Sequence, residues 1–229
     1  MPALSPEMRR IRDACRIAML EFSRRAFARL SGLPASPRIL DMGCGNGLVS
    51  RELARLSGGV VTGIDIDPME LREFARRARQ AGLNQRMHAV CMNFARPGFQ
   101  GPGFDLLWAE GVTRFIPPQE AWRQWACLAA PGGLLVLHEE RALMEGGAGG
   151  ITAADWNECG RMTLPADAWW RHYYRPLWVR FRRLQARGVN FPQAERDALR
   201  REIAALRREP ERCATAFYFY RRAAAPVRS

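Results

Sequence analysis

A glycine-rich turn after an apolar run is the part of the sequence best suited to chemistry. The motif DMGCGNG contains one acid and three alternating glycines: Asp41, Gly43, Cys44, Gly45, Asn46 and Gly47. Glycine adopts positive φ without strain and has no Cβ, so a ligand can lie against the bare backbone. In open parallel sheets, ligands bind beyond the carboxyl ends of the strands. The turn therefore predicts a ligand site, with several kinds of ligand still possible.

The glycine spacing argues against a dinucleotide and against a nucleoside triphosphate. The dinucleotide pattern G-x-G-x-x-G/A needs a small residue where this chain has Leu48, and the P-loop sequence G-K-[ST] does not follow. Asp65 ends the next apolar stretch, where an acid can accept hydrogen bonds from ribose hydroxyls. Together these features favour a nucleoside without a pyrophosphate.

Two further residues could take part in proton transfer. Glu110 and His138 each end an apolar run, FDLLWAE and GGLLVLHE, and we expect both at the same edge of a sheet. Glu110 could contact a bound ligand, and His138 could be a general base. The alternatives are a solvated loop acid and a histidine held by a structural hydrogen bond.

An aromatic helix and an arginine-rich helix could cover such a site. The stretch at 165–184 contains Tyr173 and Tyr174, which are candidate catalytic residues in a lid. Aromatic residues at helical spacing also commonly form a core. In the first helix, Arg12 and Arg16 could meet a carboxylate or phosphate of the substrate, or simply form a solvated face.

These residues require a framework of alternating strands and helices. Hydrophobic periodicity predicts helices at 8–30, 48–56, 68–81, 118–130, 165–184 and 194–208, with a short one at 153–158. Strands are expected at 38–40, 60–65, 86–92, 104–110, 132–139, 161–164 and 214–222, and 144–150 is expected to be flexible. Alternating elements imply βαβ crossovers and a parallel sheet, and near-continuous apolar strands imply burial on both faces.

Charge and cysteine usage bear on partners and location. The net charge is +12, but all 35 basic residues are arginine and they are dispersed, as a coding bias toward arginine would also produce. A small acidic substrate is therefore favoured over nucleic acid. The six cysteines lie among apolar neighbours in the sequence and show no C-x-x-C or metal-ligand spacing, so we expect no metal and a reducing compartment, the cytoplasm. No apolar run approaches the ~20 residues of a membrane span, and no membrane partner is expected.

Taken together, these motifs resemble those of the class I S-adenosylmethionine (SAM) dependent methyltransferases. ILDMGCGNG and GIDID resemble the first two motifs of that family, and FDLLWAEG with LAAPGGLLVLHE resembles its fourth strand, helix and fifth strand. LPADAWWRHYYRPL and the closing FYFY resemble a bacterial branch with small-molecule or unassigned substrates. The resemblance implies a Rossmann-like, doubly wound α/β fold. Its seven-stranded sheet would have the order 3-2-1-4-5-7-6, with strand 7 antiparallel and helices on both faces.

The resemblance also implies a cofactor and a set of residues that bind it. SAM would be the cofactor and S-adenosylhomocysteine the product. Asp41, Gly43, Cys44, Gly45, Asn46, Gly47 and Glu110 would surround the methionine part, and Asp65, Ile66, Met92, Asn93 and Phe94 would hold the ribose and adenine. Asn93 stands where the family often has an aspartate. Its amide oxygen can still accept from the adenine amino group, or it can be a turn residue only.

We therefore expect one domain over 1–229, with an N-terminal helical lid at 1–36, a SAM-binding core at 37–140, and a cap with the last strands at 141–229. The expected reaction is in-line methyl transfer to O, N or C of a small molecule. A methyltransferase acting on RNA or protein is an alternative, although Glu110 departs from the N-P-P-[YF] motif of nucleobase and glutamine methyltransferases. A non-catalytic SAM-binding regulator is another. The chain is expected to be a monomer or a homodimer.

Overall fold

The structure is a computed structural model that describes residues 4–112, 115–116, 118–145, 155–209 and 213–223. The elements are, in order, α1 (Pro6–Phe27), β1 (Arg38–Met42), α2 (Leu48–Ser57), β2 (Val60–Asp65), α3 (Pro68–Gln80), β3 (Met87–Cys91), β4 (Phe104–Glu110), α4 (Pro118–Leu128), β5 (Ala129–Glu140), α5 (Arg141–Glu145), β6 (Trp156–Thr163), the π-helical turn η2 (Trp170–Tyr174), α6 (Arg175–Ala186), α7 (Gln193–Arg208) and β7 (Thr215–Arg222). Within these ranges, no helix is long and apolar enough to cross a membrane.

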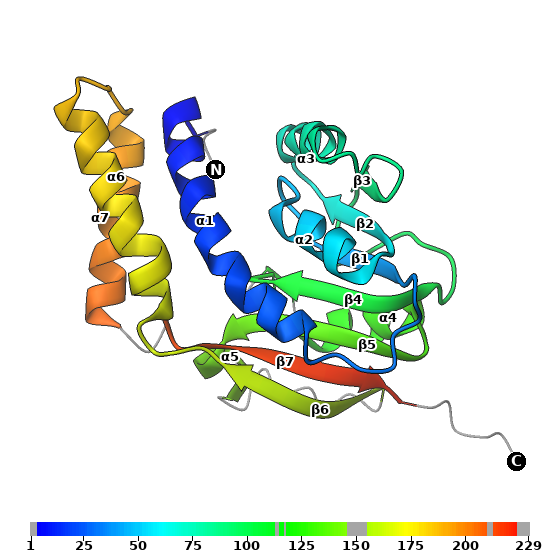
Figure 1. Cartoon of the computed structure of the whole chain (residues 1–229). Coiled ribbons are helices and arrows are strands. Elements are labelled where there is room, and N and C mark those ends of the chain that lie inside the picture. Colours follow the sequence, from blue (N-terminus) through cyan, green and yellow to red (C-terminus); the bar gives the residue numbers. More distant parts are fainter. Residues whose placement is uncertain (1–3, 113–114, 117, 146–154, 210–212, 224–229) are drawn as a thin grey trace, which may run out of the picture.

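The strands form one seven-stranded sheet in the order β3-β2-β1-β4-β5-β7-β6 (Figure 1). Strands β1 to β5 pair in parallel, whereas β7 is antiparallel to both β5 and β6. This confirms the predicted Rossmann-like, doubly wound fold and its antiparallel last strand. The strand order reverses at β1, so the crevice beyond its carboxyl end is the expected ligand site of this topology.

Helices cover both faces of the sheet, as predicted (Figure 1). One buried cluster joins the sheet to α1, α2, α3, α6 and α7, and a second joins the opposite face to α4 and α5. Neighbouring residues of one strand belong to different clusters, as Leu107 and Trp108 of β4 do. Because side chains alternate between faces, burial on both sides explains why the central strands are almost uniformly apolar.

Helix α1 lies between α2 and α3 on one side and the cap helices α6 and α7 on the other (Figure 1). Its N-cap residue is Ser5, whose Oγ accepts a hydrogen bond from the backbone N–H of Met8, and Pro6 occupies the first turn. The Ser5 hydroxyl donates in turn to Glu195 at the start of α7. The beginning of α1 is therefore bonded directly to the cap.

The aromatic helix expected at 165–184 forms from residue 168 to residue 186, but it is not regular. Its π-helical turn η2 is closed by a bond from the backbone N–H of Arg175 to the carbonyl oxygen of Trp170, five residues earlier. Pro176 has no N–H to donate to the preceding turn, which accounts for a departure from regular geometry here. Wide turns of this kind often occur at functional sites.

Two sequence-based predictions need correction. The short helix expected at 153–158 is wrong at residues 156–158, which begin β6 because Trp156 is buried and its indole N–H donates to the Trp122 carbonyl. Residues 153–154, and residues 146–150 of the stretch expected to be flexible, lie outside the described residues. Although all six cysteines are free, the ones at 91, 127 and 159 are exposed and do not act as buried hydrophobic side chains.

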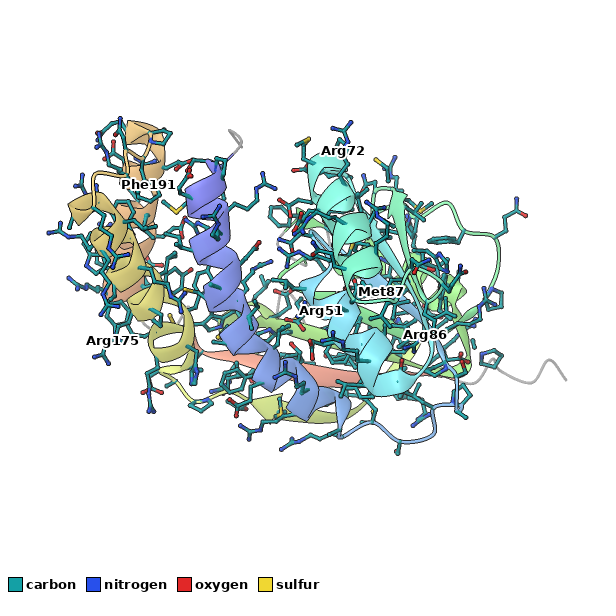
Figure 2. The ribbon with its side chains drawn as sticks, turned by 45° about the horizontal axis from the view of Figure 1, so that its top comes forward. Arg51, Arg72, Arg86, Met87, Arg175 and Phe191 are labelled. Atoms are coloured by element: carbon teal, nitrogen blue, oxygen red, sulfur yellow. The ribbon has the colours of Figure 1, made fainter. Side chains whose placement is uncertain are left out.

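The arginines are spread over the molecule. Arg175 in the cap and Arg72 in α3 lie on opposite sides of α1 (Figure 2). Many arginines pair with carboxylates, as Arg77 does with Asp13 at 2.6 Å. The dispersal expected from the sequence is therefore also found in three dimensions.

Candidate functional site

A cavity of about 560 Å³ lies where the crevice rule places a ligand. Its floor is the glycine loop after β1 together with the ends of β4 and β5. One face of α1 forms a wall, and residues of the aromatic helix and α7 close the far side. The α1 residues that line it are Arg12, Arg16, Met19, Leu20 and Ser23.

The three loop glycines have different roles. Gly43, Gly45 and Gly47 all have positive φ, at 70°, 50° and 78°. A Cβ on Gly43 would stand 2.5 Å from Val112, and one on Gly47 would stand 2.5 Å from a ring atom of Phe74. Packing within the chain therefore accounts for these two glycines. A Cβ on Gly45 would meet nothing closer than 3.9 Å, so this glycine leaves open space.

Asp41 is buried at the floor of the cavity. Its carboxylate accepts a hydrogen bond from the Ser50 hydroxyl. Burial raises the pKa of Asp41 to about 7, the Ser50 bond opposes this rise, and the charges of Glu110 and Asp65 add to it. A site that gathers acids in this way favours a cation as its ligand. The cation would also lower the pKa of Asp41.

Asp65 fixes the loop from the side of β2. One carboxylate oxygen accepts from the backbone N–H of Gly45 and the other from that of Asp67, each at 2.9 Å. The acid expected to bind ribose is therefore also a structural acceptor for the glycine loop. Asp65 does not line the cavity.

The residues expected to bind adenine also lie outside the cavity. Ile66 is 64% exposed, which is unusual for such an apolar side chain and leaves it available to a ring. Phe94 approaches the position of a Cβ on Gly43 to 3.7 Å. The oxygen of Asn93 accepts from the backbone N–H of Ala95 at 2.8 Å, which is the turn role considered above. Met92 is partly buried beside them.

Glu110 and His138 meet at the carboxyl edge of the sheet, as predicted, because β4 and β5 pair at these two residues. His138 Nδ1 lies 3.5 Å from Glu110 Oε2. Glu110 Oε1 accepts from Ser23 at 2.8 Å and from the Trp108 indole at 2.9 Å. Burial raises the pKa of Glu110, but its contact with His138 and the hydrogen bonds from Trp108 and Ser23 outweigh burial and hold this pKa below its ordinary value. The carboxylate is therefore kept ionised.

The two candidate tyrosines line the cavity on its cap side. The Tyr173 hydroxyl accepts from Arg12 at 3.2 Å, and Arg12 also forms a bidentate pair with Glu202 of α7. Burial, followed by the charge of Glu202, raises the pKa of Tyr174 above its ordinary value. The Tyr174 phenol therefore stays protonated at neutral pH and can donate a hydrogen bond.

Ser23 and Thr215 are among the polar residues of this site that sequence reasoning missed. Ser23 of α1 donates to Glu110, and Thr215 of β7 contacts His138 Nε2 at 3.0 Å. Thr215 could have been found from topology, since the first residue of an antiparallel strand lies at the carboxyl edge of its parallel neighbours. Ser23 could not have been identified from the sequence, because the hydrophobic periodicity of α1 does not determine the angle at which this helix packs on the sheet.

Helix α1 forms polar contacts with the glycine loop and with α3, as well as with the cap. Asn46 Nδ2 donates to Asp13 at 2.9 Å, and Arg9 pairs with Glu70 of α3 at 2.8 Å. Cys44 lines the cavity beside them, and burial raises the pKa of its thiol, so it is no nucleophile. The helix therefore closes the site with specific contacts and not by apolar packing alone.

Comparison with known proteins gives a partial match. Residues 39–133 match a family model described as a methyltransferase domain. The 24-methylenesterol C-methyltransferase 2 of Oryza sativa subsp. japonica is 36% identical over 110 residues, which are 47% of this chain and 30% of the relative. The ubiquinone biosynthesis O-methyltransferase of Caulobacter sp. (strain K31) is 31% identical over 129 residues, 55% of this chain and 51% of the relative. The chain spans about half or less of the length of these curated relatives.

Among solved structures, the [4+2]-cyclase SpnF superposes with a TM-score of 0.73 at 20% identity, covering 93% of this chain and 82% of that one. This likeness concerns the fold. The family match runs from β1 into β5, so it contains the glycine loop, Asp65 and Glu110. It leaves out α1 and the cap, which form the other wall of the cavity.

Proposed function

We propose, from the premise that this chain carries a class I SAM-dependent methyltransferase domain, that it transfers the methyl group of SAM to a small-molecule acceptor. One observation carries the proposal. The glycine loop opens into a cavity that α1 and the cap close on the opposite side. A second molecule can therefore meet a cofactor held at the loop.

The residues at the loop fit SAM. Helix α2 begins at Gly47 without a side-chain cap, so its first N–H groups are available to the methionine carboxylate. Asp41 and Glu110 would face the methionine ammonium, and Asp65 with the exposed Ile66 would take the ribose and the adenine ring. When bound, SAM supplies a methyl group on a positively charged sulfur that leaves as a neutral thioether.

The chain's own contribution to the reaction would be positioning. Methyl transfer needs the acceptor atom, the methyl carbon and the sulfur in line, and holding two reactants in this geometry removes much of the barrier. Met19 and Leu20 of α1 present an apolar wall, and Tyr173 and Tyr174 present aromatic rings opposite. Glu110 would accept a hydrogen bond from an N–H or O–H of the ligands.

We infer that the acceptor carries an acidic group, which Arg16 would bind. Arg12 is already paired with Glu202. Arg16 lines the cavity one turn further along α1, and no hydrogen-bond or ion-pair partner is found for it within the described ranges. An Arg16→Gln variant should raise the KM for the acceptor and leave SAM affinity unchanged. Arg10→Gln, an exposed change on the same helix, is the matched control and should alter neither quantity.

A methyl-release assay tests the function. After calorimetric titration with SAM and S-adenosylhomocysteine, the protein is incubated with labelled SAM and separate metabolite, RNA and protein pools. Labelling of a metabolite fraction supports the proposal. Labelling of RNA or protein instead would point to a macromolecular substrate, and binding without turnover on any pool would point to a regulator.

The free thiols fit a reducing compartment, and we propose that the protein is located in the cytoplasm.

A further inference from the structure

Four side chains from separate elements form a continuous polar path beside the cavity, through two hydrogen bonds and one longer contact. The indole N–H of Trp169, in the aromatic helix, lies 3.1 Å from Thr215 Oγ1. Thr215 Oγ1 lies 3.0 Å from His138 Nε2, and His138 Nδ1 lies 3.5 Å from Glu110 Oε2. The path therefore links the cap, β7, β5 and β4.

The direction of each bond follows from what its groups can donate. An indole nitrogen only donates, so Thr215 Oγ1 accepts from Trp169. The single hydroxyl proton of Thr215 then goes to His138 Nε2, since no other acceptor for it is found in the described part of the chain. Nε2 is thus the unprotonated nitrogen, and Nδ1 carries the proton toward Glu110. The opposite tautomer would set a lone pair against a carboxylate.

His138 is immobilised in this path and has no free lone pair. Its ring stacks on those of Phe217 and Trp169, with centroid distances of 4.2 Å and 6.0 Å, and the residue is 6% exposed. Both ring nitrogens are engaged, Nε2 by Thr215 and Nδ1 by Glu110. The geometry therefore fits a histidine that orients another group, and it does not fit a base that reaches the substrate.

The oriented group is the Glu110 carboxylate. Its Oε1 is occupied by two donors, Ser23 and Trp108. Its Oε2 has one long contact, with His138, and so has acceptor capacity remaining, and the Glu110 residue lines the cavity. Three donors from α1, β4 and β5 thus leave a single direction in which this carboxylate can accept a further hydrogen bond.

We propose that Trp169, Thr215 and His138 are positioning residues that fix Glu110 Oε2 as the acceptor for an N–H or O–H of the ligands in the cavity. This rests on the proposed methyl transfer. The hydrogen donor is either the ammonium of the cofactor or the group to be methylated on the acceptor molecule. Because Trp169 belongs to the helix that covers the cavity, the position of the cap and the orientation of the Glu110 carboxylate are coupled.

The first experiment reads the tautomer of His138 directly. The chain has three histidines, so the imidazole nitrogens of ¹⁵N-histidine-labelled protein can be assigned with His138→Gln as the reference. At pH 8 we expect a protonated Nδ1 and an unprotonated Nε2. Thr215→Val should remove this preference, Thr215→Ser should restore it, and Trp178→Phe, on the same helix away from the path, should leave it unchanged. An Nε2–H tautomer or an imidazolium in the wild type would overturn the proposal.

The second experiment measures the effect on the ligands. A lost hydrogen bond of about 1 kcal/mol corresponds to about fivefold. Trp169→Phe and Thr215→Val should each weaken S-adenosylhomocysteine binding about fivefold if Glu110 holds the ammonium. They should lower kcat about fivefold at unchanged S-adenosylhomocysteine affinity if it holds the acceptor. Wild-type affinity and turnover in both variants would refute the positioning role. Absence of SAM binding by the wild type would instead refute the methyl transfer, whereas the tautomer would still report on the polar path.

Discussion

Replacing Asp41 with asparagine should stabilise the free protein at alkaline pH. Burial raises the pKa of Asp41 from 3.8 to about 7. Between these values the folded protein retains a proton that the unfolded chain has released. The stability contributed by this group is therefore fully present below about pH 3.8 and is lost as the pH rises through about 7. Asparagine resembles the protonated acid, keeps an acceptor for the Ser50 hydroxyl and does not ionise.

The size of the effect follows from the interval that is crossed. One pKa unit corresponds to about 1.4 kcal/mol, so raising the pH from 5 to 8 should cost the wild type about 3 kcal/mol relative to Asp41→Asn. Urea denaturation of both proteins at pH 5, 6, 7 and 8 measures this difference in the free energy of unfolding. The same variant should bind SAM more weakly, because the cavity floor loses a negative charge.

A surface variant provides the control. Asp197 lies on α7 beside Arg200, with a side chain that is 38% exposed. Asp197→Asn should follow the wild-type pH curve. Parallel curves for the wild type and Asp41→Asn between pH 5 and 8 would mean that Asp41 ionises normally in the folded protein. In that case, our account of a buried acid at the cavity floor that is matched to a cation would be wrong.

Three further variants probe the loop and the helix above it. Asp65→Ala should weaken SAM binding by about 1–3 kcal/mol in calorimetry, since it also removes the acceptor of the Gly45 N–H; unchanged affinity would contradict the cofactor placement. Gly47→Ala should lower the urea midpoint, because its Cβ would meet Phe74 at 2.5 Å; an unaltered midpoint would contradict this packing. Asp13→Ala should speed S-adenosylhomocysteine dissociation in stopped flow by freeing α1 from Asn46; an unchanged rate would mean that α1 does not hold the loop.

Much of the fold could be predicted because it depends on local patterns. Apolar strand periods with glycine and proline stops located most strands and helices, whereas the sheet order and the antiparallel β7 came from the resemblance to the methyltransferase family. The meeting of Glu110 and His138 followed from topology alone. The helix predicted at 153–158 failed because pairing with β7 overrides weak local preference at Trp156.

The hydrogen bonds between polar side chains of the site depend on how the helices pack against the sheet. Most of them could therefore not be predicted from the sequence. Nothing in the spacing of α1 indicates that Ser23 donates to Glu110 or that Asp13 accepts from Asn46. The sequence also suggested that three glycines make room for a ligand. In the folded chain, Val112 and Phe74 occupy the space beside two of them.

Titration of the purified 229-residue chain with S-adenosylhomocysteine, by isothermal calorimetry at pH 7.5, tests the central claim most directly. The account predicts saturable binding of one molecule per chain, and weaker binding by the Asp65→Ala variant. Absence of binding to a folded wild-type protein would contradict the cofactor assignment, and with it the proposed methyl transfer.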